Sequence, residues 1–108
     1  MTKPFLLYHW SPIERRSRIK HYGMLPGSHS VTKEWKPPYT CWSDSPSLAW
    51  ALSGMMHGKG REWDLWTMWS NVPKGYELLT FDDGEPKEYR VYERIWKRSI
   101  WYVGTRIS

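Results

Sequence analysis

Cysteine is almost absent from this chain of 108 residues, since Cys41 is the only one. A single thiol cannot form an internal disulfide, and it cannot build a cysteine-based zinc site. Long hydrophobic runs are absent as well, because no apolar stretch approaches the roughly 18 residues of a membrane span. The first residues also lack the apolar core of a signal peptide. We therefore expect a protein without membrane association and with a cytoplasmic location.

Ile and Val are scarce, and the sequence contains neither a glycine-rich phosphate loop nor an HExxH pair of histidines. Nine Trp, seven Tyr and two Phe compensate for this scarcity, because aromatic rings bury a large area each. A chain of this length forms one domain, residues 1–108, with a modest core. Tryptophan must supply much of that core, and we expect the surplus indoles to line a groove or a partner surface.

Positive charge exceeds negative charge, with 16 Lys and Arg against 11 Asp and Glu and a formal net charge of +5. Such a balance favours anionic partners, such as nucleotides or nucleic acid, through long-range attraction. Four of the cations, Arg15, Arg16, Arg18 and Lys20, fall in one predicted helix. A solvated helix face is the simpler interpretation of these four, and phosphate binding is the alternative.

A histidine follows the first predicted strand directly. Leu6–Tyr8 has the pattern of a short buried strand, and His9 comes next. Ser11 is predicted to cap a helix over residues 12–22, which Gly23 would end. His9 would then lie at a rigid junction between strand and helix, a favourable place for a functional side chain. The alternative is a partly buried packing histidine.

The remaining elements follow in a recognisable order. A polar loop is predicted over residues 28–38, and Ser45 and Pro46 open a second helix. Strands are predicted over residues 39–43, 63–69, 76–81, 87–95 and 100–107. This order indicates an α+β domain with its strands concentrated in the C-terminal half.

Two of these strands have informative alternation. Glu88, Arg90 and Tyr92 share one face of their strand, a mixed polar and aromatic face that suits a cleft lining. A solvated face with a cross-strand ion pair is the alternative. In the last strand, alternation places Trp101, Val103 and Thr105 on one face.

Four segments, taken in order, resemble the ADP-ribosyltransferase family: LYHWSP before a basic helix, GMLPG, TCWSDSPSLAWAL and KEYRVYERIWKRSIWYVG. The chain is also similar to uncharacterised proteins of actinobacterial phages. The resemblance covers nearly the full length. It implies a split β-sheet core with two helices in the N-terminal half, and it implies NAD as the bound substrate.

The resemblance assigns roles to individual residues. His9 matches the family's histidine that hydrogen-bonds a ribose of NAD, and Glu88 matches the glutamate that holds the 2′-hydroxyl of the nicotinamide ribose. Cys41 stands where the family has an aromatic that stacks on nicotinamide, which a thiol cannot do. Tyr39 or Trp35 is the expected substitute. The resemblance thus implies His9 and Glu88 as catalytic residues, and as the full cofactor-binding set His9, Ser11, Tyr39, Cys41, Ser43 and Glu88.

Two functions follow from these residues. The first is transfer of ADP-ribose from NAD to a protein or nucleic-acid acceptor, with Glu88 stabilising the positive charge that develops on the ribose. The second is a catalytically inactive domain of the same fold that captures a nucleotide or a host protein through a Trp-rich surface. In either case we expect His9 and Glu88 on facing strands of one cleft, partly covered by the loop 28–38.

Overall fold

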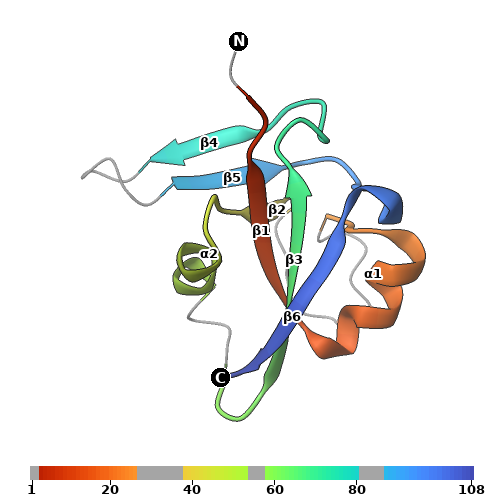
Figure 1. Ribbon diagram of the computed structural model, residues 1–108, viewed down its shortest axis with the longest axis vertical. Helices are drawn as coiled ribbons and strands as arrows, with labels where there is room; N and C mark the ends of the chain where they lie inside the picture. The colour runs from red at the N-terminus through yellow and green to blue at the C-terminus, as the bar shows by residue number, and fades with distance from the viewer. Residues whose placement is uncertain (1–2, 27–37, 54–57, 81–86) are drawn as a thin grey trace.

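The computed structural model describes residues 3–26, 38–53, 58–80 and 87–108. Two helices and two three-stranded antiparallel sheets make up an α+β domain, so the predicted class is confirmed (Figure 1). The elements are β1 (Leu6–Pro12), α1 (Arg16–Tyr22), β2 (Thr40–Trp42), α2 (Pro46–Leu52), β3 (Glu62–Trp69), β4 (Glu77–Thr80), β5 (Lys87–Val91) and β6 (Trp101–Ile107). Short 3-10 helices lie at Ile13–Arg15 and Lys97–Ser99.

In the described part of the chain, one backbone bridge connects the two sheets. The first sheet has the strand order β1-β3-β6, and the second has the order β2-β5-β4. Tyr8 of β1 and Ser43, just after β2, exchange two backbone hydrogen bonds of 2.7 and 3.0 Å. The six strands therefore form two half-sheets joined edge to edge between β1 and β2.

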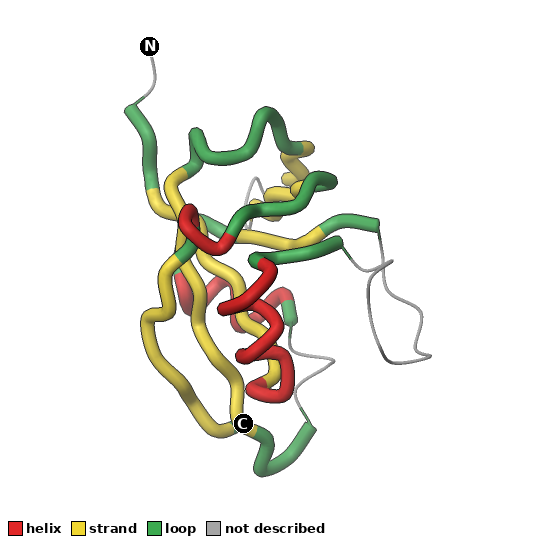
Figure 2. Tube along the Cα trace, turned by 90° about the vertical axis from the view of Figure 1, so that its right-hand side faces the viewer, coloured by secondary structure: helices red, strands yellow, loops and turns green. Residues whose placement is uncertain are grey.

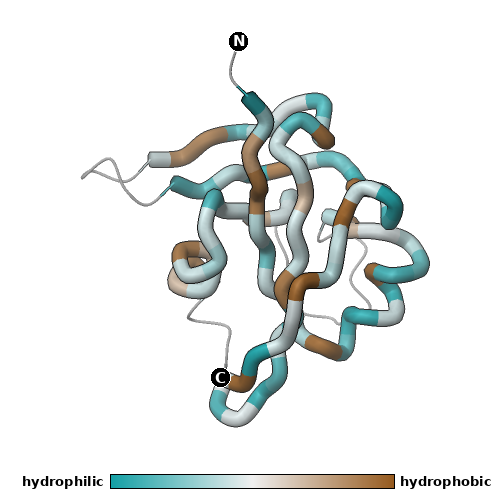
Figure 3. The backbone as a smooth tube through the Cα atoms, in the orientation of Figure 1, coloured by the Kyte–Doolittle hydropathy of each residue, from teal (hydrophilic) through white to brown (hydrophobic). Residues whose placement is uncertain are grey.

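Aromatic side chains fill the core, as the composition predicts. Trp42, Trp63 and Trp66 are all buried. One side of the first sheet packs with α1 and the second sheet, and Ile19 is the buried residue of α1 there. Figure 3 shows that α1 is otherwise mainly hydrophilic.

The second helix lies on the other side of the first sheet, opposite α1 (Figures 1 and 2). Trp50 of α2 makes edge contacts with Trp10 at 5.0 Å and with Trp63 at 6.2 Å between ring centroids. The Trp10 indole also donates to the carbonyl of Pro46 at 2.9 Å. Within the described residues, no helix is long and apolar enough to cross a membrane.

The predicted junction after Tyr8 is wrong, because β1 continues to Pro12. His9 lies in mid-strand opposite Trp66, and Ser11 lies opposite Asp64. Ser11 caps no helix: its hydroxyl accepts a hydrogen bond from the Trp66 indole at 3.0 Å. The α-helix begins only at Arg16 and has no side-chain cap. Pairing with β3 thus overrides the local capping signal.

The other two predictions about helix ends, the Ser45 cap and the Gly23 terminus, are confirmed. Ser45 caps α2, since its hydroxyl accepts from the Leu48 amide at 3.1 Å. Gly23 ends α1 with φ +84° and ψ −167°, a conformation essentially restricted to glycine. A Cβ at this position would lie 2.0 Å from the Ile95 carbonyl oxygen.

The strand predictions hold for β3, whereas β5 and β6 differ. β5 ends at Val91 instead of Ile95, because Ile95 forms a bridge with Met24. In β6 the pairing register shifts opposite Leu65 and Trp66, which leaves Val103 as an extra residue. Thr105 therefore lies on the face of Tyr102, not on the face of Trp101 as alternation predicts.

Several predictions fall outside the described residues. They concern the loop 28–38, of which only Pro38 is described, and the possible stacking residue Trp35.

Candidate functional site

Cys41 links the two residues for which the family resemblance implies catalytic roles. The His9 imidazole Nδ1 lies 2.6 Å from the carbonyl oxygen of Cys41. The Cys41 thiol donates to Glu88 Oε1 at 2.9 Å. Three strands, β1, β2 and β5, thus bring these residues together across 79 sequence positions between 9 and 88.

The two side chains reach Cys41 from different sides. Trp42 pairs with Tyr89, and both are buried in the core. Alternation therefore directs Cys41 and Glu88 to the opposite, outer face of the second sheet. The His9 ring lies at the seam between the sheets, 5.3 Å from the Trp42 ring. His9 and Glu88 do not simply face each other, and their sharing of one cleft stays a prediction.

Glu88 is a buried carboxylate with two donors. Its residue is 9% exposed, and Oε1 accepts from Arg90 Nε at 3.2 Å as well as from the Cys41 thiol. Arg90 also lies 3.8 Å from Glu77 Oε1 on β4, directly across the strand pair. The cross-strand ion pair that the sequence offers as an alternative is therefore present beside the candidate site.

Tyr39 lies on the same outer face, two residues before Cys41. The Arg90 guanidinium lies 4.4 Å from the centre of the Tyr39 ring, and the Tyr92 ring is 5.5 Å away. The Tyr92 hydroxyl donates to Glu77 Oε1 at 3.0 Å. An aromatic ring therefore stands next to the carboxylate cluster, at the position expected to replace the missing stacking residue.

The protonation states of His9 and Cys41 follow from their burial. Burial lowers the pKa of His9 to about 4, although the hydrogen bond to the Cys41 carbonyl opposes this shift. The imidazole is thus neutral at pH 7. Because a carbonyl oxygen can only accept, Nδ1 carries the proton and Nε2 is left as an acceptor. Burial, together with the bond to Glu88 and its charge, raises the pKa of Cys41 to about 12, so the thiol remains protonated.

Ser43 adds a buried hydroxyl to this face. The residue is fully buried, and its Oγ has no hydrogen-bond partner among the residues that the structure describes. Alternation from Trp42 directs Ser43 to the side of Cys41 and Glu88. Since buried hydroxyls are nearly always paired, a ligand or a water molecule is the expected partner.

Ser11 is not brought into this group. Its hydroxyl accepts the hydrogen bond from the Trp66 indole, which belongs to β3, on the side of β1 away from Cys41. The cofactor-binding role that the resemblance implies for Ser11 therefore has no support in its contacts.

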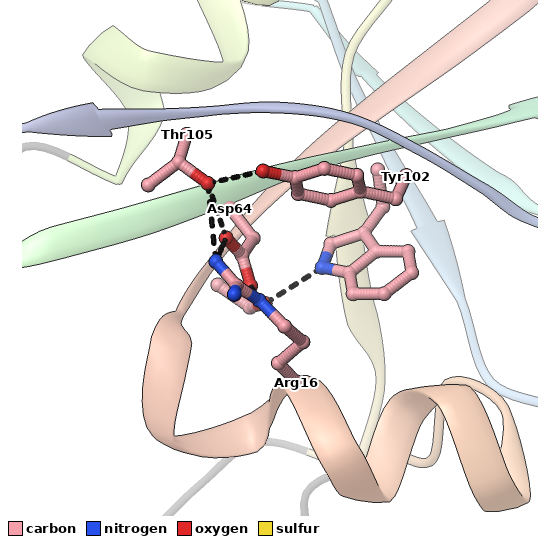
Figure 4. A network of polar contacts seen from close by, with 6 residues as sticks. Arg16, Asp64, Tyr102 and Thr105 are labelled. Carbon is pink, nitrogen blue, oxygen red and sulfur yellow. Dashed lines mark hydrogen bonds and ion pairs between the residues drawn. The ribbon is translucent and has the colours of Figure 1, made fainter.

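A second polar cluster lies near Ser11 (Figure 4). The Asp64 carboxylate is fully buried and accepts from Arg16 at 2.9 and 2.7 Å and from Thr105 at 2.7 Å. Tyr102 contacts the Thr105 hydroxyl with its own. Arg16 is thus fixed by an ion pair, although its side chain stays 40% exposed, so solvation alone does not describe this arginine. The signal in the sequence is an acid inside the apolar strand of residues 63–69.

No group of three His, Cys, Asp or Glu side chains that could hold a metal ion occurs within the described ranges. No protein-family model matches the sequence, and neither a curated protein nor a solved structure is significantly similar to it.

Proposed function

We propose that this chain is an ADP-ribosyltransferase-like domain that binds NAD and transfers ADP-ribose to a protein or nucleic-acid acceptor. The supporting fold features are the two half-sheets joined at the Tyr8–Ser43 bridge and the two helices in the N-terminal half. The family resemblance implies this kind of split sheet.

The observation that carries the proposal is the grouping around Cys41. On the outer face next to this residue lie a buried carboxylate (Glu88) and a buried hydroxyl (Ser43) that has no partner among the described residues, and a neutral His9 approaches the Cys41 carbonyl from the other side. A ribose needs such groups, because its hydroxyls both donate and accept hydrogen bonds.

The proposed chemistry uses the Glu88 charge. The bond between ribose C1′ and the nicotinamide nitrogen breaks, and its electron pair neutralises the pyridinium ring. Positive charge then develops on C1′ and the ring oxygen, where a nearby carboxylate stabilises it. The acceptor nucleophile attacks C1′ and releases its proton to solvent. Tyr39 is the proposed stacking partner for nicotinamide.

A second candidate function is binding of the nucleotide without transfer. Arg90 lies 3.2 Å from the Glu88 carboxylate, and this positive charge offsets the negative charge that catalysis needs. The thiol of Cys41 replaces the aromatic side chain that the family places there. Both observations favour a domain that keeps the binding groups and has lost turnover.

Titration with NAD, followed by tryptophan fluorescence and calorimetry, tests the binding that both candidates share. Trp42 reports directly, since its ring lies 5.3 Å from His9. We expect saturable quenching that Ser43→Val weakens, whereas Ser47→Val, a change at an exposed residue of α2, leaves it unchanged. Absence of binding at millimolar NAD contradicts the proposal. Release of nicotinamide, measured in parallel, separates the enzyme from the inactive binder.

A further inference from the structure

The segment Arg94–Arg98 lies against the C-terminal end of α1. Met24 and Ile95 exchange backbone hydrogen bonds of 2.8 and 2.9 Å, and Arg94 Nε donates to the Tyr22 carbonyl at 2.9 Å. Gly23 lets the two backbones approach this closely, since any Cβ there would overlap the Ile95 carbonyl. These contacts hold the side chains around Trp96 on a rigid base.

Trp96 is presented outward on this base. It is 62% exposed, more than any other described tryptophan, and the Arg94 guanidinium lies 3.9 Å from its ring centre. Arg94 covers one face of the indole, so the exposed area belongs largely to the other face. Tyr22, 47% exposed, is connected to this ring through the same arginine, since its carbonyl accepts from Arg94 Nε. A core role cannot explain so exposed an indole.

Positive charge surrounds this ring. Lys97 and Arg98 follow Trp96 directly, and both are exposed. Among the described residues, no carboxylate forms an ion pair with Arg94, Lys97 or Arg98. The neighbouring acid, Glu93, instead accepts a hydrogen bond from the Lys74 amide at 2.6 Å. The cations are therefore available for an anionic partner.

We propose that Tyr22, Arg94, Trp96, Lys97 and Arg98, the Trp96 patch, form a docking surface for single-stranded nucleic acid. An open indole face can stack on an unpaired base, and the three adjacent cations suit the phosphates on either side. Paired bases in a duplex are already stacked and cannot use the indole. A net charge of +5 strengthens the attraction.

This inference deepens the proposed function by naming the acceptor class, and it rests on that function only for the acceptor role. Binding itself is measured without NAD. If the protein binds the oligonucleotide but does not bind NAD, the proposed NAD-dependent function is contradicted. The proposed role of the Trp96 patch is then still supported.

The test is fluorescence anisotropy with a labelled 12-nucleotide single strand, as RNA and as DNA, and with the matching duplex. We expect at least one single strand to bind more tightly than its duplex. Trp96→Ala should weaken single-strand binding about 5- to 150-fold, the range for loss of one base stack. Trp96→Phe should retain part of the binding, and Trp69→Ala, a 43% exposed indole elsewhere, should not change it.

The salt dependence provides a second measurement. The double variant Lys97→Gln and Arg98→Gln should lower the slope of log K against log salt concentration by about 1.4, because each phosphate contact of a single strand contributes about 0.7. Lys59→Gln with Lys74→Gln, two exposed lysines outside the patch, is the charge-matched control. Unchanged binding by Trp96→Ala, tighter binding of duplex, or equal binding of polyglutamate overturns the proposal.

Discussion

The Cys41 thiol donates to Glu88 Oε1 at 2.9 Å, and the same oxygen accepts from Arg90 at 3.2 Å. A protonated thiol stabilises the carboxylate by a hydrogen bond without neutralising it, whereas Arg90 brings a compensating charge. The relative strength of these two interactions decides how strongly the Glu88 carboxylate can stabilise positive charge on a bound sugar.

The first prediction concerns the reactivity of Cys41. Its pKa of about 12 against an ordinary value of 9.0 leaves about a thousandfold less thiolate at neutral pH. We expect iodoacetamide to label the native protein far more slowly than the protein in urea. Glu88→Gln should accelerate native labelling, because the charge that opposes the thiolate is gone. Equal rates for folded and unfolded protein would contradict this assignment.

The second prediction concerns turnover. If the protein releases nicotinamide, Glu88→Gln should lower kcat by about 10² to 10³, the usual cost of one lost electrostatic interaction with the transition state. NAD binding should persist, since an amide still accepts hydrogen bonds. His9→Ala should mainly weaken binding. Glu77→Gln removes a carboxylate from the same face and serves as the control. An active Glu88→Gln protein refutes the catalytic role.

The third prediction is a pH dependence of stability due to His9. Its pKa is about 4 in the folded protein against 6.5 ordinarily, so the unfolded chain binds the proton first. The neutral histidine therefore contributes stability that is complete above pH 6.5 and is lost as the pH falls toward 4. The slope is at most about 1.4 kcal/mol per pH unit. Urea unfolding of His9→Gln should lack this component, and His21→Gln, a change at an exposed residue, should retain it.

The fourth prediction separates backbone strain from steric overlap. Gly23→Ala places a methyl group 2.0 Å from the Ile95 carbonyl oxygen. Gly60 also has a positive φ, +71°, but a Cβ there meets nothing within 4 Å. Gly60→Ala should cost about 1 to 2 kcal/mol from strain alone, and Gly23→Ala clearly more. Thermal melts that give both variants the same loss would show that α1 can move away from Ile95.

The fifth prediction concerns the buried carboxylate of Asp64. Burial acts to raise its pKa, but hydrogen bonds from Arg16 and Thr105 outweigh burial and lower the pKa below the ordinary 3.8. Asp64→Asn should cost about 2 kcal/mol of unfolding free energy, typical for hydrogen bonds to a charged group. The exposed Glu62→Gln on the same strand should cost little. The contribution of Asp64 persists above pH 4 and disappears as the pH falls through its lowered pKa.

Local chemistry explains which parts of the fold the sequence predicts. The Ser45 cap and the Gly23 terminus depend on a few neighbouring residues, so their signals are reliable. Ser11 carries the same cap signal but pairs with a strand more than 50 positions away, which no local pattern reveals. Tertiary pairing also shortens β5, where Ile95 leaves to join Met24.

The candidate site divides in the same way. Motif order places His9, Cys41 and Glu88 on three separate strands. The contacts between them depend on register, since Cys41 lies opposite Arg90 and reaches Glu88 diagonally. The Asp64–Arg16 pair spans 48 positions, and the only sign of it in the sequence is an acidic residue inside an apolar strand.

The extra residue in β6 reverses the alternation of side chains along the strand. Before Val103 the chain is in one frame with Tyr102 facing α1, and after it the frame is reversed, so that Thr105 faces the same way and reaches Asp64. The bulge here matters more than the side chain that fills it. Many side chains can replace the exposed Val103, and deleting it would give regular alternation that still places Thr105 on the face of Tyr102. Regular pairing of the full sequence, without the bulge, would instead turn Thr105 away and leave the buried carboxylate one donor short.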